Sequence, residues 1–329
     1  MKALVYTGPE SLDFRDVPDP ARDENCVLIE VAHVGICGSD MHAWAGHDER
    51  RPAPLILGHE AVGRIVEGSG IGKRVTVNPL VTCGACDDCR AGRENLCARR
   101  QIISMPPREG AFAEKLVMPP ASLVPIPDRV TSERAALTEP IACGWHAVRL
   151  AQRVLSRPLG EAVCLVFGGG AIGLGAALVL AARGGREIWL AETNPARRAI
   201  LEDVGDFRVF DPGSIRGPDG VDLIVDGVGS QGTRSAASSA IRPGGVIAHI
   251  GLGAADGGLN IRRMTLQEVT FIGTYTYTQA DFRDTAAAIF ADQFGKLDWA
   301  EVRPLSDGAR AFADIKTGRV AAPKIILQP

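Results

Sequence analysis

The chain has 329 residues, of which 46% are hydrophobic and 23% charged, and its formal net charge at neutral pH is −3. This length allows two domains of about 100–200 residues each, and the composition is that of an ordinary globular protein. There is no basic excess that would indicate a nucleic acid or an anionic membrane surface as a partner.

The N-terminal residues MKALVYT predict a first strand rather than a signal peptide, because no long apolar run follows the positive charge. The longest apolar stretch, residues 171–182, is too short for a transmembrane helix and is interrupted by glycines. We therefore expect a soluble, cytoplasmic protein.

The remaining pattern divides the chain into three parts. Residues 1–146 combine many Gly and Pro residues with short β-like runs, which predicts a distorted, barrel-like all-β domain. Residues 147–277 alternate strands (162–168, 187–192, 221–227, 245–251, 269–275) with helices (171–183, 195–204, 231–241), which predicts a parallel sheet covered on both faces. Residues 278–329 contain one amphipathic helix and short terminal strands.

Four of the eight cysteines lie close together in the sequence: Cys83, Cys86, Cys89 and Cys97. Disulfides are not expected in a chain without an export signal, whereas four thiolates suit a closed tetrahedral zinc site that stabilises a loop. Free cysteines and an iron–sulfur cluster are the alternatives, and the spacing favours zinc.

Three separated segments, GICGSDMH (35–42), GHE (58–60) and TEP (138–140), contain further metal-ligand residue types. Cys37, His59 and Glu139 would supply the sulfur, nitrogen and oxygen ligands of a catalytic zinc, which needs about three protein ligands and one open position. The sequence alone does not show that these segments meet. Cys143, four residues after Glu139, is an alternative third ligand.

A glycine-rich run follows the strand at 162–168 and opens the helix at 171–183. Gly168, Gly170 and Gly173 form a G-x-G-x-x-G pattern there, with Ala171 and Ile172 between the last two glycines. In this context the glycines permit a tight turn, close approach of a pyrophosphate and close helix–strand packing, while the helix N-terminus attracts phosphates.

An acidic residue, Glu192, ends the next predicted strand, 19 residues after Gly173. A carboxylate at this position accepts the ribose hydroxyls of NAD and repels the 2′-phosphate of NADP. Arg197 lies five residues further on and could instead favour NADP. The pattern therefore predicts a dinucleotide site and leaves NADP as the alternative to NAD.

Together these motifs resemble the zinc-containing medium-chain alcohol dehydrogenase family, in its sorbitol dehydrogenase branch, along essentially the whole chain. The resemblance implies a GroES-like β-barrel catalytic domain and a Rossmann doubly wound domain. It implies hydride transfer between NAD and the CH–OH group of an alcohol such as a polyol, sugar alcohol or sugar acid. Two zinc ions per chain, one catalytic and one structural, and a homodimer or homotetramer joined through the nucleotide domains are expected from the same likeness.

The resemblance also implies roles around the catalytic metal. Glu60 becomes a fourth or exchange ligand beside Cys37, His59 and Glu139. Asp40 orients His59.

For the proton and the cofactor, the same likeness makes Ser39 the acceptor of the alcohol proton and His42 the shuttle at the solvent end. Arg197 flanks the adenine, which in this branch goes with NAD. The ends of the later strands are expected to line the nicotinamide, namely Ile250, Gly251, Leu252, Thr274, Tyr275 and Thr276.

Two positions depart from the sorbitol dehydrogenase pattern. Ala43 stands where that branch usually has Tyr after the motif's His, and Thr276 stands where it tends to have Arg before Tyr277. Simple secondary alcohols and threonine-like amino alcohols therefore stay open as substrates. The polar stretch 47–51 (HDERR) is either a substrate-contacting segment or a solvated loop.

Other classes of function remain as alternatives. The cysteine cluster could be the working part of a zinc-ribbon interaction module, although the dinucleotide motif and the acidic balance speak against it. A family member that has lost catalysis, or a zinc-free quinone reductase of the same fold, would not need Cys37 and His59.

Overall fold

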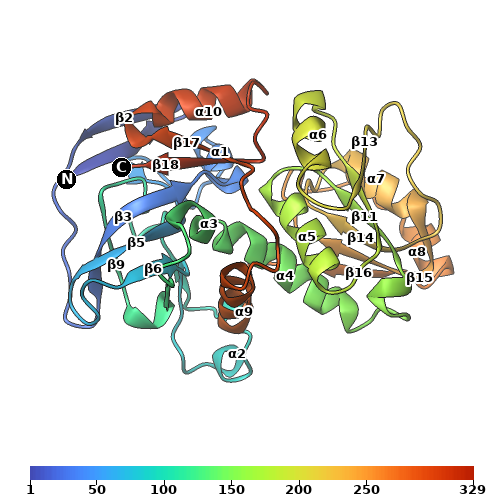
Figure 1. Cartoon of the computed structure of the whole chain (residues 1–329), viewed down its shortest axis with the longest axis horizontal. Coiled ribbons are helices and arrows are strands. Elements are labelled where there is room, and N and C mark those ends of the chain that lie inside the picture. Colours follow the sequence, from blue (N-terminus) through green and yellow to red (C-terminus); the bar gives the residue numbers. More distant parts are fainter.

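Two β-sheet systems of different character organise the chain, and the computed structural model describes all 329 residues (Figure 1). The N-terminal half, with the C-terminal strands β17 (Ala300–Pro304) and β18 (Lys324–Gln328), forms mostly antiparallel sheets. Their strand orders are β2-β1-β4 and β10-β6-β5-β3-β18-β17, and β9 also pairs with β3. The strands of the N-terminal half are β1 (Lys2–Gly8), β2 (Ser11–Asp16), β3 (Val27–Gly35), β4 (Leu55–Ile56), β5 (Glu60–Glu67), β6 (Arg74–Val77), β7 (Leu80–Val81), β8 (Gln101–Ile102), β9 (Lys115–Met118) and β10 (Leu123–Pro125).

The second half forms a six-stranded parallel sheet in the order β13-β12-β11-β14-β15-β16. This is the doubly wound arrangement, in which the strand order reverses beside β11. Its elements are β11 (Val163–Phe167), α5 (Ala171–Ala182), β12 (Glu187–Ala191), α6 (Pro195–Glu202), β13 (Arg208–Phe210), β14 (Val221–Asp226), α7 (Gln231–Ala240), β15 (Ile241–His249), α8 (Ile261–Leu266) and β16 (Thr270–Gly273).

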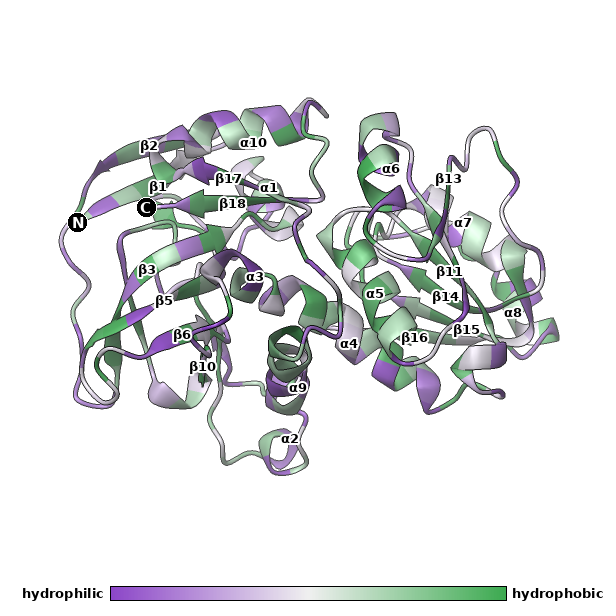
Figure 2. Ribbon diagram, in the orientation of Figure 1, coloured by the Kyte–Doolittle hydropathy of each residue, from purple (hydrophilic) through white to green (hydrophobic).

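Alternate residues of the central strands explain why both faces of this sheet are covered. On β11, Cys164 and Val166 belong to the core shared with α4 (Thr138–Gln152) and α5, whereas Leu165 and Phe167 pack with residues of α7 and α8. Because successive side chains of a strand point to opposite faces, a run that is apolar throughout requires helices on both sides. Figure 2 shows this apolar character along the buried strands.

The C-terminal segment returns to the N-terminal half. It comprises α9 (Gln279–Phe290), β17 (Ala300–Pro304), α10 (Gly308–Lys316) and β18 (Lys324–Gln328). The last strand pairs with β3, so the chain end completes the sheet that began near residue 27. Figure 1 shows this return, with the C-terminus lying among the blue N-terminal strands.

The N-terminal half is less purely β than the sequence predicts. It also contains the helices α1 (Gly38–Trp44), α2 (Asp87–Arg90), α3 (Ser132–Ala136) and α4 (Thr138–Gln152). The predicted domain boundary between residues 146 and 147 falls inside α4. The boundary itself stays a prediction. Gly144 lets α4 approach α5 closely, because a Cβ at this position would lie 2.6 Å from the Ala176 nitrogen.

A buried ionic network fastens α9 to α4. Asp281 accepts hydrogen bonds from Arg149 and Thr278 and lies 2.7 Å from His146 Nδ1. Burial raises the pKa of Asp281, but these partners outweigh burial and hold that pKa well below its ordinary value. The carboxylate is therefore charged in the folded protein and pairs the two helices. No helix of the structure combines the length and the apolar character needed to cross a bilayer.

Candidate active site

A cleft of about 570 Å³ separates the two halves at the carboxyl ends of β11 and β14. It contains all seven residues predicted for the phosphate and ribose end of the cofactor: Gly168, Gly170, Ala171, Ile172, Gly173, Glu192 and Arg197. It is also lined by Cys37 and Met41 from the N-terminal half and by Lys324 from the chain end. Ligands of doubly wound sheets bind at this reversal point, so the cleft has the place and size of a dinucleotide site.

The three motif glycines take the roles expected for them. Gly168 has φ +93°, a left-handed conformation that favours glycine. A Cβ on Gly173 would lie 1.8 Å from the Gly168 carbonyl oxygen, so only glycine allows α5 to start this close to β11. A Cβ on Gly170 would meet no protein atom within 4 Å, which leaves the backbone open to a ligand. These features fit a pyrophosphate at the start of α5.

Glu192 is buried at the edge of the cleft and is held by the backbone. Its Oε2 accepts a hydrogen bond from the Gly169 nitrogen at 2.8 Å, and its Oε1 accepts one from the Asn194 nitrogen at 2.7 Å. Arg197 lies 3.6 Å from Glu192 and donates to the carbonyls of Val320 and Ala321. The guanidinium is therefore already engaged by protein groups.

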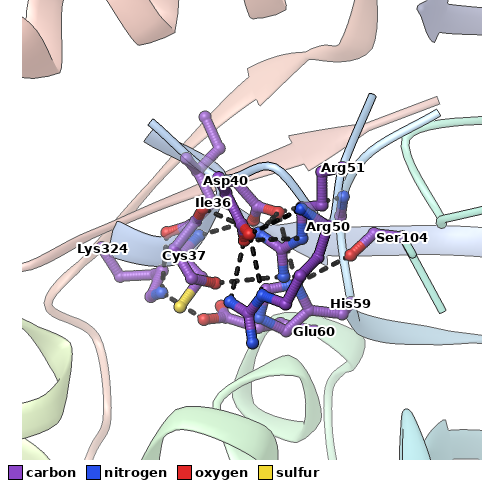
Figure 3. Close-up of polar contacts among 12 residues, drawn as sticks. Ile36, Cys37, Asp40, Arg50, Arg51, His59, Glu60, Ser104 and Lys324 are labelled. Carbon is purple, nitrogen blue, oxygen red and sulfur yellow. Dashed lines mark hydrogen bonds and ion pairs between the residues drawn. The ribbon is translucent and has the colours of Figure 1, made fainter. Parts of the chain in front are cut away.

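At the other end of the cleft, the structure brings Cys37, His59 and Glu60 together (Figure 3). One ligand atom from each lies within 4.8 Å of the others. Cys37 caps the start of α1, and His59 directly precedes Glu60, the first residue of β5, which pairs with β3. A thiol, an imidazole and a carboxylate form a donor set that zinc accepts.

His59 is oriented by a buried carboxylate. Asp40 Oδ1 lies 3.3 Å from His59 Nδ1, which leaves Nε2 free to bind a metal. Burial raises the pKa of Asp40, but His59 and Arg51 together lower it to about 2. Burial lowers the pKa of His59, but the negative charges of Asp40 and Cys37 raise it well above its ordinary value. The predicted role of Asp40 as the orienting partner is consistent with this geometry.

Glu139 lies outside this compact group. Its Oε1 accepts a hydrogen bond from the hydroxyl of Tyr277 at 2.7 Å, and both side chains are buried. Burial, together with the charge of Glu60, raises the pKa of Glu139 to about 7. Burial and the charges of Glu139 and Cys37 likewise raise the pKa of Cys143 well above its ordinary value. Glu139 and Cys143, the two candidate third ligands, are therefore both close enough to Glu60 for its charge to affect their pKa values.

Two basic residues that sequence reasoning did not assign to the site are buried beside it. Arg51 is 3% exposed and donates to the Ser39 carbonyl at 2.7 Å and to Ser39 Oγ at 3.5 Å. Lys324 is 5% exposed and donates to Glu60 Oε1 at 2.6 Å. The 47–51 stretch is therefore neither purely a substrate loop nor purely solvated, because Arg51 turns inward while Glu49 and Arg50 stay exposed.

The predicted proton path begins beside Cys37. Ser39 is half-buried and His42 is exposed, three residues apart on α1 and so on one face of the helix. His42 lines a second cleft of about 820 Å³ together with His249, Gly251 and Leu252. The neighbouring α1 residues Met41 and His42 line the first and the second cleft, respectively.

The remaining strand-end residues lie elsewhere. None of Ile250, Thr274, Tyr275 and Thr276 lines either cleft. Thr274 bonds to the His249 carbonyl, and the Tyr275 ring is covered by Arg100, whose guanidinium carbon lies 4.9 Å from its centroid. Their expected contact with nicotinamide stays a prediction.

The four clustered cysteines converge on one point. Their sulfur atoms all lie within 4.8 Å of one another, and no disulfide joins them. Backbone N–H groups of Ala85 and Cys86 lower the pKa of Cys83 to about 5, which favours the thiolate. This arrangement fits a closed tetrahedral zinc site.

Comparison with known proteins now places the chain in a family. Residues 23–128 match the alcohol dehydrogenase GroES-like domain, and residues 171–292 match the zinc-binding dehydrogenase domain. The L-galactonate-5-dehydrogenase of Escherichia coli K12 is 34% identical over 297 residues, covering 86% of this chain and 85% of that protein. The chain belongs to the zinc-binding alcohol dehydrogenase family.

Further members of this alcohol dehydrogenase family agree with the polyol branch and the fold. The sorbitol dehydrogenase of Bacillus subtilis is 32% identical, covering 84% of this chain and 82% of that protein. The structure of a zinc-binding dehydrogenase from Sinorhizobium meliloti bound to NADP superimposes with a TM-score of 0.87 at 26% identity, covering 100% and 99% of the two chains. The expected family, fold class and class of enzyme are confirmed.

We predict that replacing Cys97 by Ser lowers the zinc content from two ions per chain to one and lowers the thermal midpoint. Structural zinc contributes about 10–16 kcal/mol of apparent binding free energy in small peptides, so the loss should be large. Atomic emission and thermal unfolding measure both effects. Cys26→Ser is the matched control, because Cys26 is buried but outside the cluster; an unchanged zinc content in Cys97→Ser would refute the assignment.

Proposed function

We propose that the chain is a zinc-dependent, NAD-linked dehydrogenase that interconverts an alcohol and a carbonyl group in a polyol, sugar alcohol or sugar acid. The supporting observation is that Cys37, part of the candidate metal group, lines the same cleft as the glycine-rich loop. An alcohol beside Cys37 and a nicotinamide would therefore share one cavity. A simple secondary alcohol or a threonine-like amino alcohol remains the second candidate, because Ala43 and Thr276 depart from the sorbitol dehydrogenase pattern.

In this proposal Cys37, His59 and Glu139 hold the ion, and Glu60 is the exchange ligand. Glu139 can contribute one oxygen while Tyr277 keeps the other. A bound zinc supplies Lewis-acid polarisation of the alcohol oxygen.

The remaining chemistry belongs to the polar side chains of α1. Ser39 accepts the alcohol proton as it passes its own hydroxyl proton onward through the cofactor ribose or water, and His42, on the same helix face, releases a proton toward the second cleft. The Arg51 contact with Ser39 Oγ leaves the hydroxyl proton free to point away from the guanidinium.

We expect Cys37→Ser to lower turnover by at least about 10³-fold, because metal polarisation of the reacting oxygen supplies several kcal/mol. Binding of NADH should change little, because the glycine-rich loop and Glu192 are untouched. The measurement is a panel of polyols, sugar acids and secondary alcohols with NAD, followed by absorbance of the reduced nicotinamide. Cys26→Ser is the control, and full activity in Cys37→Ser would exclude the proposed catalytic metal site.

We also propose NAD rather than NADP as the preferred cofactor. Glu192 places a buried carboxylate at the ribose end of the cleft, and Arg197, the one arginine that lines this cleft, is engaged by Glu192 and two backbone carbonyls. The Sinorhizobium meliloti neighbour holds NADP, so the preference rests on these residues of this chain.

Glu192→Ala should weaken NADH binding by about 10- to 100-fold, the effect of losing a charged hydrogen bond. NADPH binding should weaken less, because the carboxylate opposes the 2′-phosphate. Fluorescence titration with both cofactors measures the two dissociation constants. Glu202→Ala, on the exposed side of α6, should change neither, and equal losses for both cofactors would count against the ribose role.

A homodimer or homotetramer joined through the parallel sheets completes the proposal. β16 is an edge strand, and large apolar side chains near it are exposed, including Leu252, Ile261, Leu266 and Phe271. Exposed apolar groups around an unpaired edge favour association. Light scattering should give a mass of two or four chains, and a monomer at micromolar concentration would refute it. The unpaired cysteines support the expected cytoplasmic location, where thiols stay reduced.

A further inference from the structure

Arg234, on α7, is a buried arginine whose hydrogen-bond partners are all backbone carbonyls. The residue is 5% exposed. Its Nε donates to the Gly257 carbonyl at 2.6 Å, its Nη1 donates to those of Gly229 and Ala254 at 3.0 Å each, and its Nη2 donates to that of Asp256. An arginine is almost never fully buried unless it is paired, so these carbonyls indicate why it is there.

The four carbonyls belong to two different loops. Gly229 lies in the loop that follows β14, whereas the other three lie in the loop that follows β15. Both loops leave the carboxyl end of the parallel sheet, where doubly wound folds bind their ligands. One side chain therefore joins two walls of the ligand crevice.

The second of these loops has little of its own to hold it in place. Residues 251–258 read GLGAADGG, so half of them are glycines. The single large apolar side chain, Leu252, is 72% exposed and anchors nothing. Glycine-rich backbone loses much conformational freedom when it is ordered. The fixed position of this loop therefore depends on contacts made by its backbone.

Those contacts form a seam without side chains between residues 228–229 and 251–254. The Gly253 nitrogen donates to the Val228 carbonyl at 3.1 Å, and the Ala254 nitrogen donates to the Gly229 carbonyl at 2.9 Å. A Cβ on Gly229 would lie 1.9 Å from the Gly251 carbonyl oxygen. The two backbones touch directly, and Arg234 spans the seam because Nη1 binds one carbonyl on each side of it.

The seam lies beside both clefts. Val228 lines the first cleft, together with the glycine-rich loop. Gly251 and Leu252 line the second cleft, together with His42 and Arg234 itself. The residues proposed to face the nicotinamide, 250–252, thus begin the loop that Arg234 holds.

We propose that Arg234 is a positioning residue for the nicotinamide end of the cofactor, which acts by clamping the 251–258 loop against residues 228–229. This inference rests on the proposed function. The guanidinium acts through the loop rather than by touching the reacting atoms. Its loss should therefore affect the nicotinamide half of the cofactor and spare the half bound by the glycine-rich loop and Glu192.

The test compares NADH with ADP-ribose, which has the adenosine and the pyrophosphate but no nicotinamide. In Arg234→Met the dissociation constant of NADH should rise about tenfold, the effect of a loop that is in place about a tenth of the time. The dissociation constant of ADP-ribose should change by less than about twofold, because its binding does not need the loop. Isothermal titration calorimetry measures both constants, and the zinc content should stay at the wild-type value.

Arg262→Met is the matched control, because Arg262 is an exposed arginine of the neighbouring helix α8. It should bind both ligands as the wild-type protein does. A purely structural role of Arg234 would weaken NADH and ADP-ribose alike. Equal losses for the two ligands in Arg234→Met, or unchanged NADH binding, would overturn the proposal.

A second variant opens the seam from the loop side and keeps the proposal testable if Arg234→Met does not fold. In Gly253→Ala the added Cβ would lie 2.8 Å from the Val228 carbonyl oxygen, so the loop must shift. The same selective loss of NADH is expected. Gly232→Ala, where the nearest listed atom lies 3.7 Å from the added Cβ, should bind both ligands normally. Equal losses or no loss in Gly253→Ala would contradict the clamp.

Failure of the proposed function gives a different result. A wild-type protein that binds neither NADH nor ADP-ribose has no dinucleotide site, and the proposed function is then wrong. A wild-type protein that binds both, with variants that do not separate them, refutes the role of Arg234 alone.

Discussion

The constraint that governs this structure is the burial of several acidic groups around one point. Asp40, Glu60 and Glu139 are each almost fully buried; Glu60 lies beside Cys37 and His59, Asp40 contacts His59, and the charges of His59 and Glu60 act on Glu139. Buried charges of one sign are unfavourable unless counter-charges or a metal accompany them. Here Arg51 compensates Asp40 and Lys324 compensates Glu60, while Glu139 has a hydrogen bond from Tyr277 but no basic partner within ion-pair distance. A divalent ion at the centre would complete this balance, and the two halves of the molecule are arranged around it.

The sequence was most informative where chemistry is confined to short motifs. The glycine-rich run, the cysteine cluster and the GHE segment each carry their meaning within about fifteen residues, because the turn, lobe or strand they form is local. Five of the six strands of the parallel sheet were also located to within a few residues, with the largest difference at β15, which starts at Ile241, whereas the short edge strand β13 was missed. Continuous apolar runs between glycines leave few alternatives for such strands.

Contacts between distant segments could not be predicted in this way. Lys324 and Glu60 are separated by 264 positions and meet only because β18, β3 and β5 are neighbours in one sheet. From the sequence, Arg51 is indistinguishable from the other charged residues of its loop; its burial and its hydrogen bond to Ser39 appear only in the structure. Helix α4 was missed because it is buried against α5, α9 and β15 and therefore lacks a clear polar face. The same reasoning placed Tyr275 near the cofactor; its ring lies against Arg100, and its contact with nicotinamide stays a prediction.

The cysteine lobe also contacts the segment that follows the last strand of the parallel sheet. Asn95 donates to the Tyr275 carbonyl at 2.8 Å, and two residues later the Tyr277 hydroxyl holds Glu139. A zinc ion bound by the four cysteines would therefore support the position of Glu139 through residues 275–277. Residues 275–277 thus link the cysteine lobe to Glu139, so ordering of the lobe would help to fix the position of this acid.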